Sequence, residues 1–434
     1  MEMGFARRPI TPDAPCQMAG YGAFRRSKGV YDELYARALA LRSGSMTVAI
    51  LQLDVLCVDE RFMRRIEPYL SEIGLSGDRL LVCCSHTHSS FGGIVDVTSG
   101  LNAQLKDLLG EENPALLDML TLQSADAIRE AMSDMRSVRV RILRGTAEGV
   151  ATNRHSAEDP CDSDVFVADF LRDDGRRVVI YNLCCHPTVL DMNNLMLSAD
   201  FPGYANQYLE NHCDMPVFIN GSAGDMSTRF TRRGSTLSEC RRIGELTGAK
   251  VAEMLKAPEE YIPVGSISLV YHTTYLKRAV YDSPDAAERK LKSASENLRA
   301  VTAATGDPSL IRKAQSVVEG ATINMLKSGL AQEGFLPEIP VKAGILSLNG
   351  TRIVCSPFEL FSTLAIKLKD KAGVEMFGYT NVYQGYLADC AAYDNMEYEA
   401  LFSDYAAGEG EAYIGKVLEI LKSESEENNN ERSE

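Results

Sequence analysis

The sequence predicts an α/β fold in which mixed β-sheets are layered with helices. Short apolar runs rich in β-branched residues alternate along the chain with segments of helical periodicity, and this favours a layered α/β protein over an all-α or all-β one. The dipeptide Asn349-Gly350 lies between two further apolar runs, at 346–348 and 352–355, and is a strong signal for a two-residue hairpin. A hairpin requires an antiparallel pair, so the sheets are predicted to be mixed.

The apolar runs give the expected strands, and the periodic segments give the expected helices. Strands are predicted at residues 47–53, 80–84, 138–143, 165–170, 178–183, 217–220 and 266–271, and helices at 114–132, 205–211 and 238–255. The segment 283–329 is rich in Ala, Lys, Glu and Ser and is interrupted at Gly306-Asp307-Pro308, which predicts a helical hairpin inserted between strands. We therefore expect one large domain over residues 1–421 that contains this insertion, followed by a disordered tail at 422–434.

Composition and charge restrict the classes of function. The chain has 434 residues, of which 45% are hydrophobic and 24% charged, as expected for a globular core. Its formal net charge of −15 argues against a nucleic-acid partner, because such binding requires a basic face. No apolar run is long enough for a signal peptide or a transmembrane helix, so no stable membrane anchor is expected. The 11 cysteines are scattered, odd in number and partly placed inside apolar runs, which favours a reduced, cytoplasmic protein. No CxxC pair indicates a structural zinc site. The sequence does not define the oligomeric state.

Four of the apolar runs end in segments rich in catalytic residue types. They lead into 85–89, 185–188, 221–227 and 356–359, which contain His86 and His88, His186, Ser227, and Glu359 respectively. Ligands of open α/β sheets bind beyond the carboxyl ends of the strands. Four such endings in one chain therefore predict a site where these segments meet.

The histidines at two of these endings suggest a metal site. His86 and His88 are two residues apart, so both project to one face if the strand geometry continues, and His186 follows a second strand. The alternative is a set of core histidines that are satisfied by hydrogen bonds, but three of the six histidines gathered in two motifs favour the metal. Cys84 and Cys184 each precede a histidine by two residues; a cysteine ligand is conceivable, and buried packing is the simpler interpretation.

The other two endings are ambiguous from the residues alone. In the 221–227 segment, Asp225 and Ser227 could orient water or substrate, or the segment could be a tight turn with an Asp cap. Glu359 could be a carboxylate in the first turn of a helix, stabilised by the helix dipole. A cluster of tyrosines follows it, and most tyrosines of this kind are packing residues.

The order of these motifs resembles the neutral/alkaline ceramidase family over residues 10–405. The segments that carry the resemblance are Ile10-Thr11-Pro12, Gly20-Tyr21, Asp32-Glu33-Leu34-Tyr35-Ala36-Arg37-Ala38, Ser85-His86-Thr87-His88-Ser89, Asn153-Arg154, His186-Pro187-Thr188, Ser198-Ala199-Asp200-Phe201-Pro202-Gly203, Gly224-Asp225-Met226-Ser227, Pro357-Phe358-Glu359, Asn381-Val382-Tyr383, Tyr386 and Tyr398-Glu399. The resemblance implies a single neutral-ceramidase-like catalytic domain.

The resemblance also implies a role for each site residue. His86, His186, Glu359 and Tyr386 look like the ligands of a Zn²⁺ ion. His88 looks like the residue that handles the proton of the attacking water, and Ser227 matches a serine described either as nucleophile or as substrate-orienting hydroxyl. Arg154 and Tyr398 match residues that line the site near the scissile amide. Two His and a carboxylate also suit a catalytic zinc that keeps one position open.

The expected activity is zinc-dependent hydrolysis of the amide bond of a small-molecule N-acyl substrate. A zinc esterase or lactonase is a second interpretation, since the same site attacks any activated carbonyl, and a catalytically silent ligand-binding relative is a third. Where the family usually has Pro-Asn after the serine, this chain has Thr228-Arg229, followed by Arg232 and Arg233. These arginines either favour a substrate smaller and more polar than ceramide, with an anionic group, or form a solvated basic loop.

Overall fold

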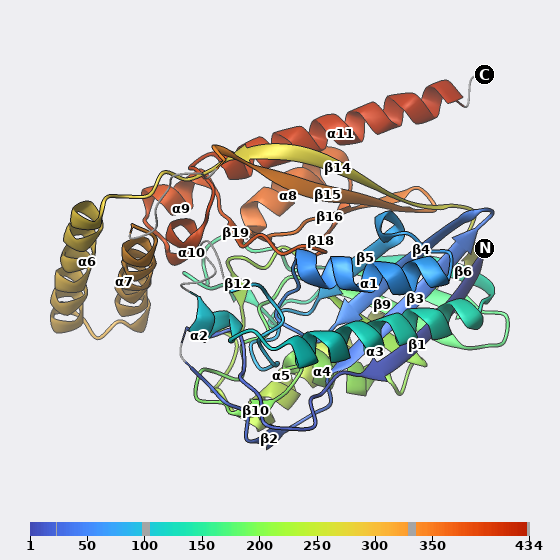
Figure 1. Cartoon of the computed structure of the whole chain (residues 1–434), viewed down its shortest axis with the longest axis horizontal. Coiled ribbons are helices and arrows are strands. Elements are labelled where there is room, and N and C mark those ends of the chain that lie inside the picture. The colour runs from blue at the N-terminus through green and yellow to red at the C-terminus, as the bar shows by residue number, and fades with distance from the viewer. Residues whose placement is uncertain (23, 98–104, 329–335, 432–434) are drawn as a thin grey trace.

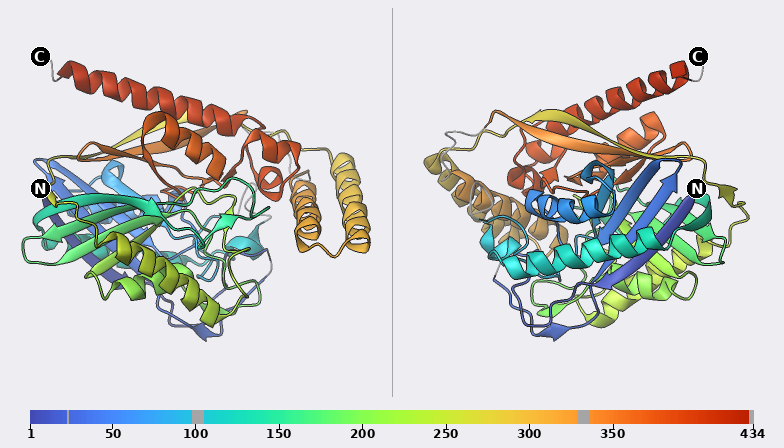
Figure 2. Two further views of the ribbon diagram at one scale, coloured as in Figure 1. Left: turned by 180° about the vertical axis from the view of Figure 1, so that it is seen from behind. Right: turned by 45° about the vertical axis from the view of Figure 1, so that its right-hand side comes forward.

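The computed structural model describes residues 1–22, 24–97, 105–328 and 336–431, and its strands and helices form four stacked layers (Figure 1). Two β-sheets lie face to face in the middle, and each is covered by helices on its outer face (Figure 2). This is the mixed, layered α/β architecture that the sequence predicts.

The larger sheet has nine strands, and the order of eight of them is β11-β9-β8-β6-β1-β3-β4-β5, with β13 pairing with β6. The pairs β4–β5 and β9–β11 are parallel and the other pairs are antiparallel. The strands are β1 (Glu2–Pro9), β3 (Tyr35–Ser43), β4 (Met46–Leu53), β5 (Leu80–Cys84), β6 (Arg136–Thr146), β8 (Asp164–Arg172), β9 (Arg177–Leu183), β11 (Met215–Asn220) and β13 (Ile262–Pro263).

The smaller sheet has the strand order β14-β15-β16-β18. Its strands are β14 (Ile267–Lys277), β15 (Glu338–Leu348), β16 (Thr351–Cys355) and β18 (Glu375–Phe377). The predicted hairpin joins β15 to β16, where Asn349 and Gly350 have φ angles of 49° and 80°, as a two-residue turn between antiparallel strands requires. Between the two sheets, Phe166 of the larger packs edge-on against Phe377 of the smaller, with ring centroids 6.2 Å apart.

Helices cover the two outer faces. The larger sheet packs against α1 (Glu60–Glu72), α3 (Pro114–Ser133), α4 (Phe201–Leu209) and α5 (Leu237–Met254), and the smaller against α8 (Ser362–Ala372) and α11 (Glu409–Glu431). In β3, residues on alternate faces serve the two sides: Ala36, Ala38 and Ala40 face the helices, and Leu39 and Leu41 face the smaller sheet. The small alanine side chains let α3 lie close to the strand.

The inserted helical hairpin consists of α6 (Pro284–Ala304) and α7 (Pro308–Ser328), in the connection between β14 and β15. The Ser283 hydroxyl caps α6, and Pro284 and Pro308 stand at the first position of each helix, where a missing N–H is not felt. The hairpin extends from the side of the molecule, and α7 packs against the short helix α10 (Tyr398–Phe402) (Figure 1).

One expectation about the chain end differs from the structure. Disorder is predicted from residue 422, but α11 continues to Glu431. Arg352 Nη1 donates to the Leu421 carbonyl and the Ser425 hydroxyl, each at 2.9 Å, and His272 pairs with Glu424 at 2.8 Å. These contacts hold a polar helix against the smaller sheet, which the local composition does not reveal. Residues 432–434 lie outside the described residues.

Three two-stranded pairs lie apart from the main sheets. They are β2 (Gly29–Val30) with β10 (Met196–Leu197), β7 (Thr152–Asn153) with β12 (Met226–Ser227), and β17 (Glu359–Leu360) with β19 (Tyr386–Leu387). The last two pairs bring segments from distant parts of the sequence to the carboxyl ends of β5, β9 and β11. Among the helices of the described ranges, none has the length and apolar character that a membrane span requires.

Candidate metal centre and active site

His86 follows β5 at a sharp change of backbone direction. Its φ angle is 66°, so the extended geometry of β5 does not continue through it, and the expectation that His86 and His88 share the face of one continuing strand is wrong. The backbone N–H of His86 donates to Val55 O at 3.0 Å, and Nδ1 donates to Leu56 O at 2.9 Å. Since a carbonyl only accepts, Nδ1 carries a proton, and in the neutral tautomer this leaves the lone pair on Nε2.

His186, after β9, is fixed in the same way. Its backbone N–H donates to Met226 O at 3.0 Å, and its Nδ1 donates to Ala223 O. The lone pair of this ring is therefore also on Nε2. Burial and the nearby Arg154 lower the pKa of His186 to about 4, so its ring is neutral near pH 7.

Glu359 brings a carboxylate to the two imidazole nitrogens. Its Oε2 lies 3.3 Å from His86 Nε2 and 2.8 Å from His186 Nε2, and the hydroxyl of Tyr383 donates to its Oε1. Oε2 of the Glu359 carboxylate therefore faces two nitrogen lone pairs, and it has no hydrogen-bond partner. A cation placed between them would be a binding partner for all three atoms: Nε2 of His86, Nε2 of His186 and Oε2 of Glu359.

His88 lies beside this set. Its ring centroid is 5.0 Å from that of His86 and 5.6 Å from that of His186, and neither of its nitrogens has a hydrogen-bond partner. The side-chain nitrogens of His86, His88 and His186 all lie within 4.8 Å of one another, so these three could also share a metal ion. Burial, followed by the neighbouring histidines, holds the pKa of His88 well below its usual range, which keeps the ring neutral.

The backbone at Gly20 packs closely against the His88 ring and helps to hold it in place. Gly20 has a φ of +103°, and a Cβ built there would lie 2.6 Å from Cγ of the His88 ring. Arg25 Nη2 donates to the His88 carbonyl at 2.8 Å, and the Tyr21 ring centroid is 5.0 Å from that of His88. The segment around Gly20-Tyr21 therefore forms one wall of the site.

Arg154 provides a fixed cation next to the histidines. Its backbone N–H donates to Asp225 O at 2.7 Å, its Nη2 donates to the Tyr386 hydroxyl at 3.1 Å, and its Nη1 lies 3.4 Å from His186 Nε2. The guanidinium also pairs with Glu399, which is 1% exposed and lies 3.0 Å from His155 Nε2. This pairing holds the Arg154 guanidinium toward Tyr386 and His186.

The remaining predicted residues complete the wall of the site. Ser227 of β12 forms a backbone bridge with His186, and its Oγ accepts from the Arg229 N–H at 3.2 Å. Tyr386 is paired with Glu359 in the β17–β19 ladder, and its ring is stacked on His186 at 6.5 Å. Tyr398 contacts the Tyr386 ring edge-on at 6.0 Å, so it lies next to the site and one residue further from the histidines.

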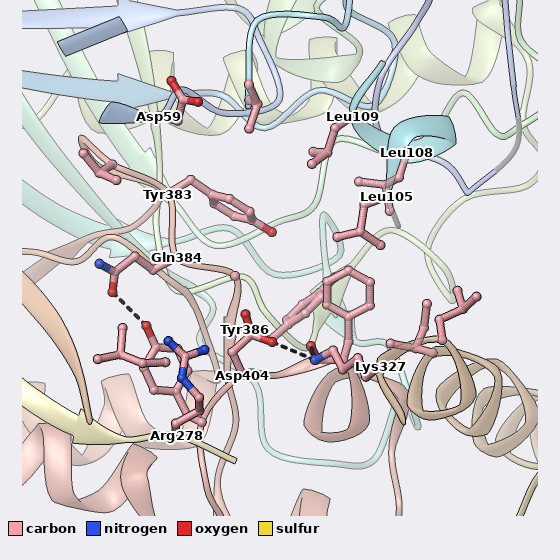
Figure 3. A pocket seen from close by; sticks show the side chains of 18 of the residues that line it. Asp59, Leu105, Leu108, Leu109, Arg278, Lys327, Tyr383, Gln384, Tyr386 and Asp404 are labelled. Atoms are coloured by element: carbon pink, nitrogen blue, oxygen red, sulfur yellow. Dashed lines mark hydrogen bonds and ion pairs between the residues drawn. The ribbon is translucent and has the colours of Figure 1, made fainter. Parts of the chain in front are cut away.

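A cavity of about 320 Å³ adjoins the site (Figure 3). Tyr383 and Tyr386 belong both to its lining and to the site described above. One part is lined by apolar side chains, including Leu105, Leu108 and Leu109 at α2 (Lys106–Leu109). On another side, Lys327 of α7 lies 2.8 Å from Asp404 Oδ1. The inserted hairpin thus supplies part of the cavity.

The structure brings all eight predicted site residues into one region, with His86, His186 and Glu359 in direct contact. Two further residues belong to the site: Tyr383, whose hydroxyl donates to Glu359, and Glu399, which pairs with Arg154. Both stand inside the motifs Asn381-Val382-Tyr383 and Tyr398-Glu399, so position in a motif was the available signal. Cys84 and Cys184 are 1% and 4% exposed, in the core, and neither belongs to a candidate metal group of the described residues.

Comparisons with known proteins give a match at the level of structure. No family model and no curated protein matches the sequence. The structure is similar to the neutral ceramidase from Pseudomonas aeruginosa, with a TM-score of 0.73 and 17% identity over 95% of this chain and 72% of that one. It is also similar to a ceramidase complexed with C2, with a TM-score of 0.73 and 18% identity over 95% of this chain and 73% of that one. The chain therefore has the neutral ceramidase fold.

Proposed function

We propose that the chain is a zinc-dependent hydrolase that cleaves the amide bond of a small N-acyl substrate. The observation that carries the proposal is the convergence of two imidazole lone pairs and one carboxylate oxygen at a buried point, next to His88 and Arg154. Zinc prefers nitrogen and oxygen ligands of this kind, and catalytic zinc sites use three protein ligands and leave a position open.

His86, His186 and Glu359 would hold the metal, with Tyr386 as a further oxygen ligand. The donor set fits, because both Nδ1 atoms are committed to backbone carbonyls and Glu359 balances part of the metal charge. We assign Glu359 rather than His88 to the metal, since its oxygen already lies within 3.3 Å of both imidazole nitrogens. When bound, zinc supplies Lewis acidity toward a carbonyl oxygen and acidifies water.

The protein groups around that position can carry the proton transfers of amide hydrolysis. His88 is neutral and unpartnered, so it can accept a proton from an attacking water and later donate it to the leaving amine. Arg154, held by Glu399, directs N–H groups to the place where charge develops on the carbonyl oxygen. Ser227 either orients the substrate or acts as the nucleophile, and Tyr398 lines the site beside Tyr386.

The adjoining cavity supports a short acyl group. Its volume of about 320 Å³ lies at the lower end of the range for ligand pockets, roughly 300–1,000 Å³. Its apolar part accepts an aliphatic chain, whereas Lys327 and Asp404 close it on a polar side. We therefore propose a substrate that is smaller and more polar than ceramide.

Two measurements test the proposal. Elemental analysis of the purified protein is expected to give about one zinc per chain, and a substrate panel is expected to show hydrolysis of N-acyl amides that a chelator abolishes and zinc restores. Faster turnover of esters or lactones than of any amide would instead identify an esterase or lactonase. Absence of bound transition metal, even after zinc is supplied, would sink the zinc assignment.

A further inference from the structure

Arg229 lies at the edge of the candidate site without a carboxylate partner. Its backbone N–H donates to the Ser227 hydroxyl at 3.2 Å, and its Nη1 donates to the Arg154 carbonyl at 2.7 Å. Within the described part of the chain, no Asp or Glu oxygen forms an ion pair with it. Other buried or partly buried arginines, such as Arg37, Arg141 and Arg177, pair with a carboxylate.

Other arginines surround Arg229 instead. Burial, followed by the positive charges of Arg312 and Arg154, lowers the pKa of Arg229 to about 9. Arg154 is paired with Glu399, and Arg312 of α7 is paired with Glu319 at 2.6 Å, so the two carboxylates of this region are already engaged. Nε of Arg312 has no hydrogen-bond partner. Arg229 therefore holds unused N–H groups beside Ser227, and the charge of Arg312 acts on it from the inserted hairpin.

Like charges held together at low dielectric are costly unless an anion joins them. A guanidinium presents a planar fork that matches the two oxygens of a carboxylate or the oxygens of a phosphate. We propose that Arg229, assisted by Arg312 of the inserted hairpin, binds an oxyanion that the substrate carries on the amine side of its scissile amide. This inference rests on the proposed amide hydrolysis and names the class of its substrate.

The positions of the cavity and of the arginines give the substrate a direction. Tyr386 belongs to both regions: its ring lines the cavity, and its hydroxyl accepts from Arg154, the residue whose carbonyl Arg229 bonds. A short acyl chain in the cavity places the amide beside Tyr386, and the amine part then extends past Arg154 toward Arg229. An N-acyl amino acid has this arrangement of an apolar chain, an amide and a carboxylate.

Arg233 serves as the matched control. It belongs to the same loop, but its side chain is exposed and it is not among the charges that act on Arg229. Arg233 therefore lies outside the proposed subsite. If the anion preference depends on the overall charge of the loop, a variant of Arg233 loses it as well; if it depends on contact with Arg229, the Arg233 variant keeps it.

The experiment compares N-hexanoylglycine, its phosphonate analogue and the neutral N-hexanoylglycinamide. For the zinc-loaded wild type, kcat/KM is expected to be about ten- to a hundredfold higher for at least one anion than for the neutral amide, the range of a hydrogen bond to a charged group. Arg229→Gln should remove most of this preference, Arg312→Gln part of it, and Arg229→Lys should restore some of it. Arg233→Gln should keep it. Zinc content and melting temperature verify that each variant is folded.

Each result decides the inference. Equal turnover of anionic and neutral substrates by the wild type, or an equal loss in Arg233→Gln and Arg229→Gln, overturns it and leaves amide hydrolysis intact. If none of the three compounds is hydrolysed, the proposed function fails for this class, and calorimetric binding of the same compounds to the zinc-loaded protein decides the anion preference alone. Tighter binding of the anions that depends on Arg229 supports the inference, and equal binding contradicts it.

Discussion

A single asparagine joins the two backbone segments that carry the histidines. The side-chain Nδ2 of Asn220 donates to Ser85 O at 3.2 Å and to Cys185 O at 3.0 Å, and its Oδ1 accepts from the Cys185 N–H at 3.2 Å. Ser85 and Cys185 directly precede His86 and His186. Asn220 is fully buried, so these bonds are not exchanged with water, and they fix the separation of the two metal-binding candidates.

Asn220→Asp tests this positioning role with an isosteric change. A carboxylate cannot donate to the two carbonyls and repels them, so unfolding should be easier by about 2–3 kcal/mol. Zinc affinity should fall roughly 10–100-fold, as for other residues that hold metal ligands in place. Competition with a chromogenic chelator measures the affinity, and thermal melting measures the stability. Unchanged zinc affinity in a destabilised protein would limit Asn220 to a structural role.

The two histidines of the Ser85–Ser89 motif are expected to differ in function. His86→Ala removes a nitrogen that lies 3.3 Å from Glu359, so the variant should lose zinc. His88→Ala should keep the zinc and lose about 10²–10⁴ of the turnover, the typical contribution of a general base. Metal content and kcat on the same preparations give the comparison. Equal loss of metal in both variants would assign His88 to the metal instead.

At the scale of elements, short two-stranded pairs complete the site. Glu359 was open to interpretation as a carboxylate in the first turn of a helix, but it belongs to β17, and α8 begins at Ser362. A segment of two residues has too little periodicity to be predicted, and the partner of Glu359, Tyr386, is distant in sequence. The segments that follow the apolar runs therefore predict which residues lie together in the site. They do not predict the secondary-structure element to which each residue belongs.

The packing of α7 on α10 connects the inserted hairpin to the site, because α10 carries Tyr398 and Glu399. A Cβ added at Gly320 would lie 2.6 Å from Cδ1 and 3.0 Å from Cβ of Leu401. Gly320→Val should therefore displace α10, destabilise the protein by about 1–3 kcal/mol and lower kcat/KM about tenfold. Steady-state kinetics and thermal melting measure both effects.

Gly306→Ala is the control for this change. Gly306 lies between α6 and α7, and no atom lies within 4 Å of a Cβ built there, so activity should stay at the wild-type level. If Gly320→Val also keeps full activity, the hairpin is not coupled to the site through α10.

At the scale of the whole molecule, the strands that the sequence did not predict occupy the middle of the larger sheet. β1 and β3 bury small residues against α3, and a Cβ added at Gly4 of β1 would lie 1.7 Å from Ala131 O. A face of Gly and Ala lacks the β-branched pattern that marked the other strands, although it is what allows the helix to pack closely. The fold class is predictable because the other strands of the sheet have buried faces made of Val, Ile and Leu side chains.

The ion pairs of His155 give the molecule a pH-dependent stability. Burial alone lowers the pKa of His155, but Glu399 at 3.0 Å and Glu397 at 3.5 Å raise it overall. A histidine with a raised pKa stabilises the fold fully below its unfolded value of about 6.5, and this contribution is lost as the pH rises through the folded pKa. The melting temperature of His155→Gln should therefore fall less than that of the wild type between pH 6 and pH 9. Parallel curves would contradict this.

The connection between β14 and β15 also has an engineering consequence. The two strands pair along their whole length, from Ile267 opposite Leu348 to Lys277 opposite Glu338, so the chain leaves and re-enters the sheet at adjacent points. A segment of this kind can be exchanged like a cassette when the replacement bridges the neighbouring strand ends and keeps the packing against α10. Libraries of grafted hairpins in place of α6 and α7 would vary the residues at Arg312 and Lys327 while leaving His86, His186 and Glu359 untouched.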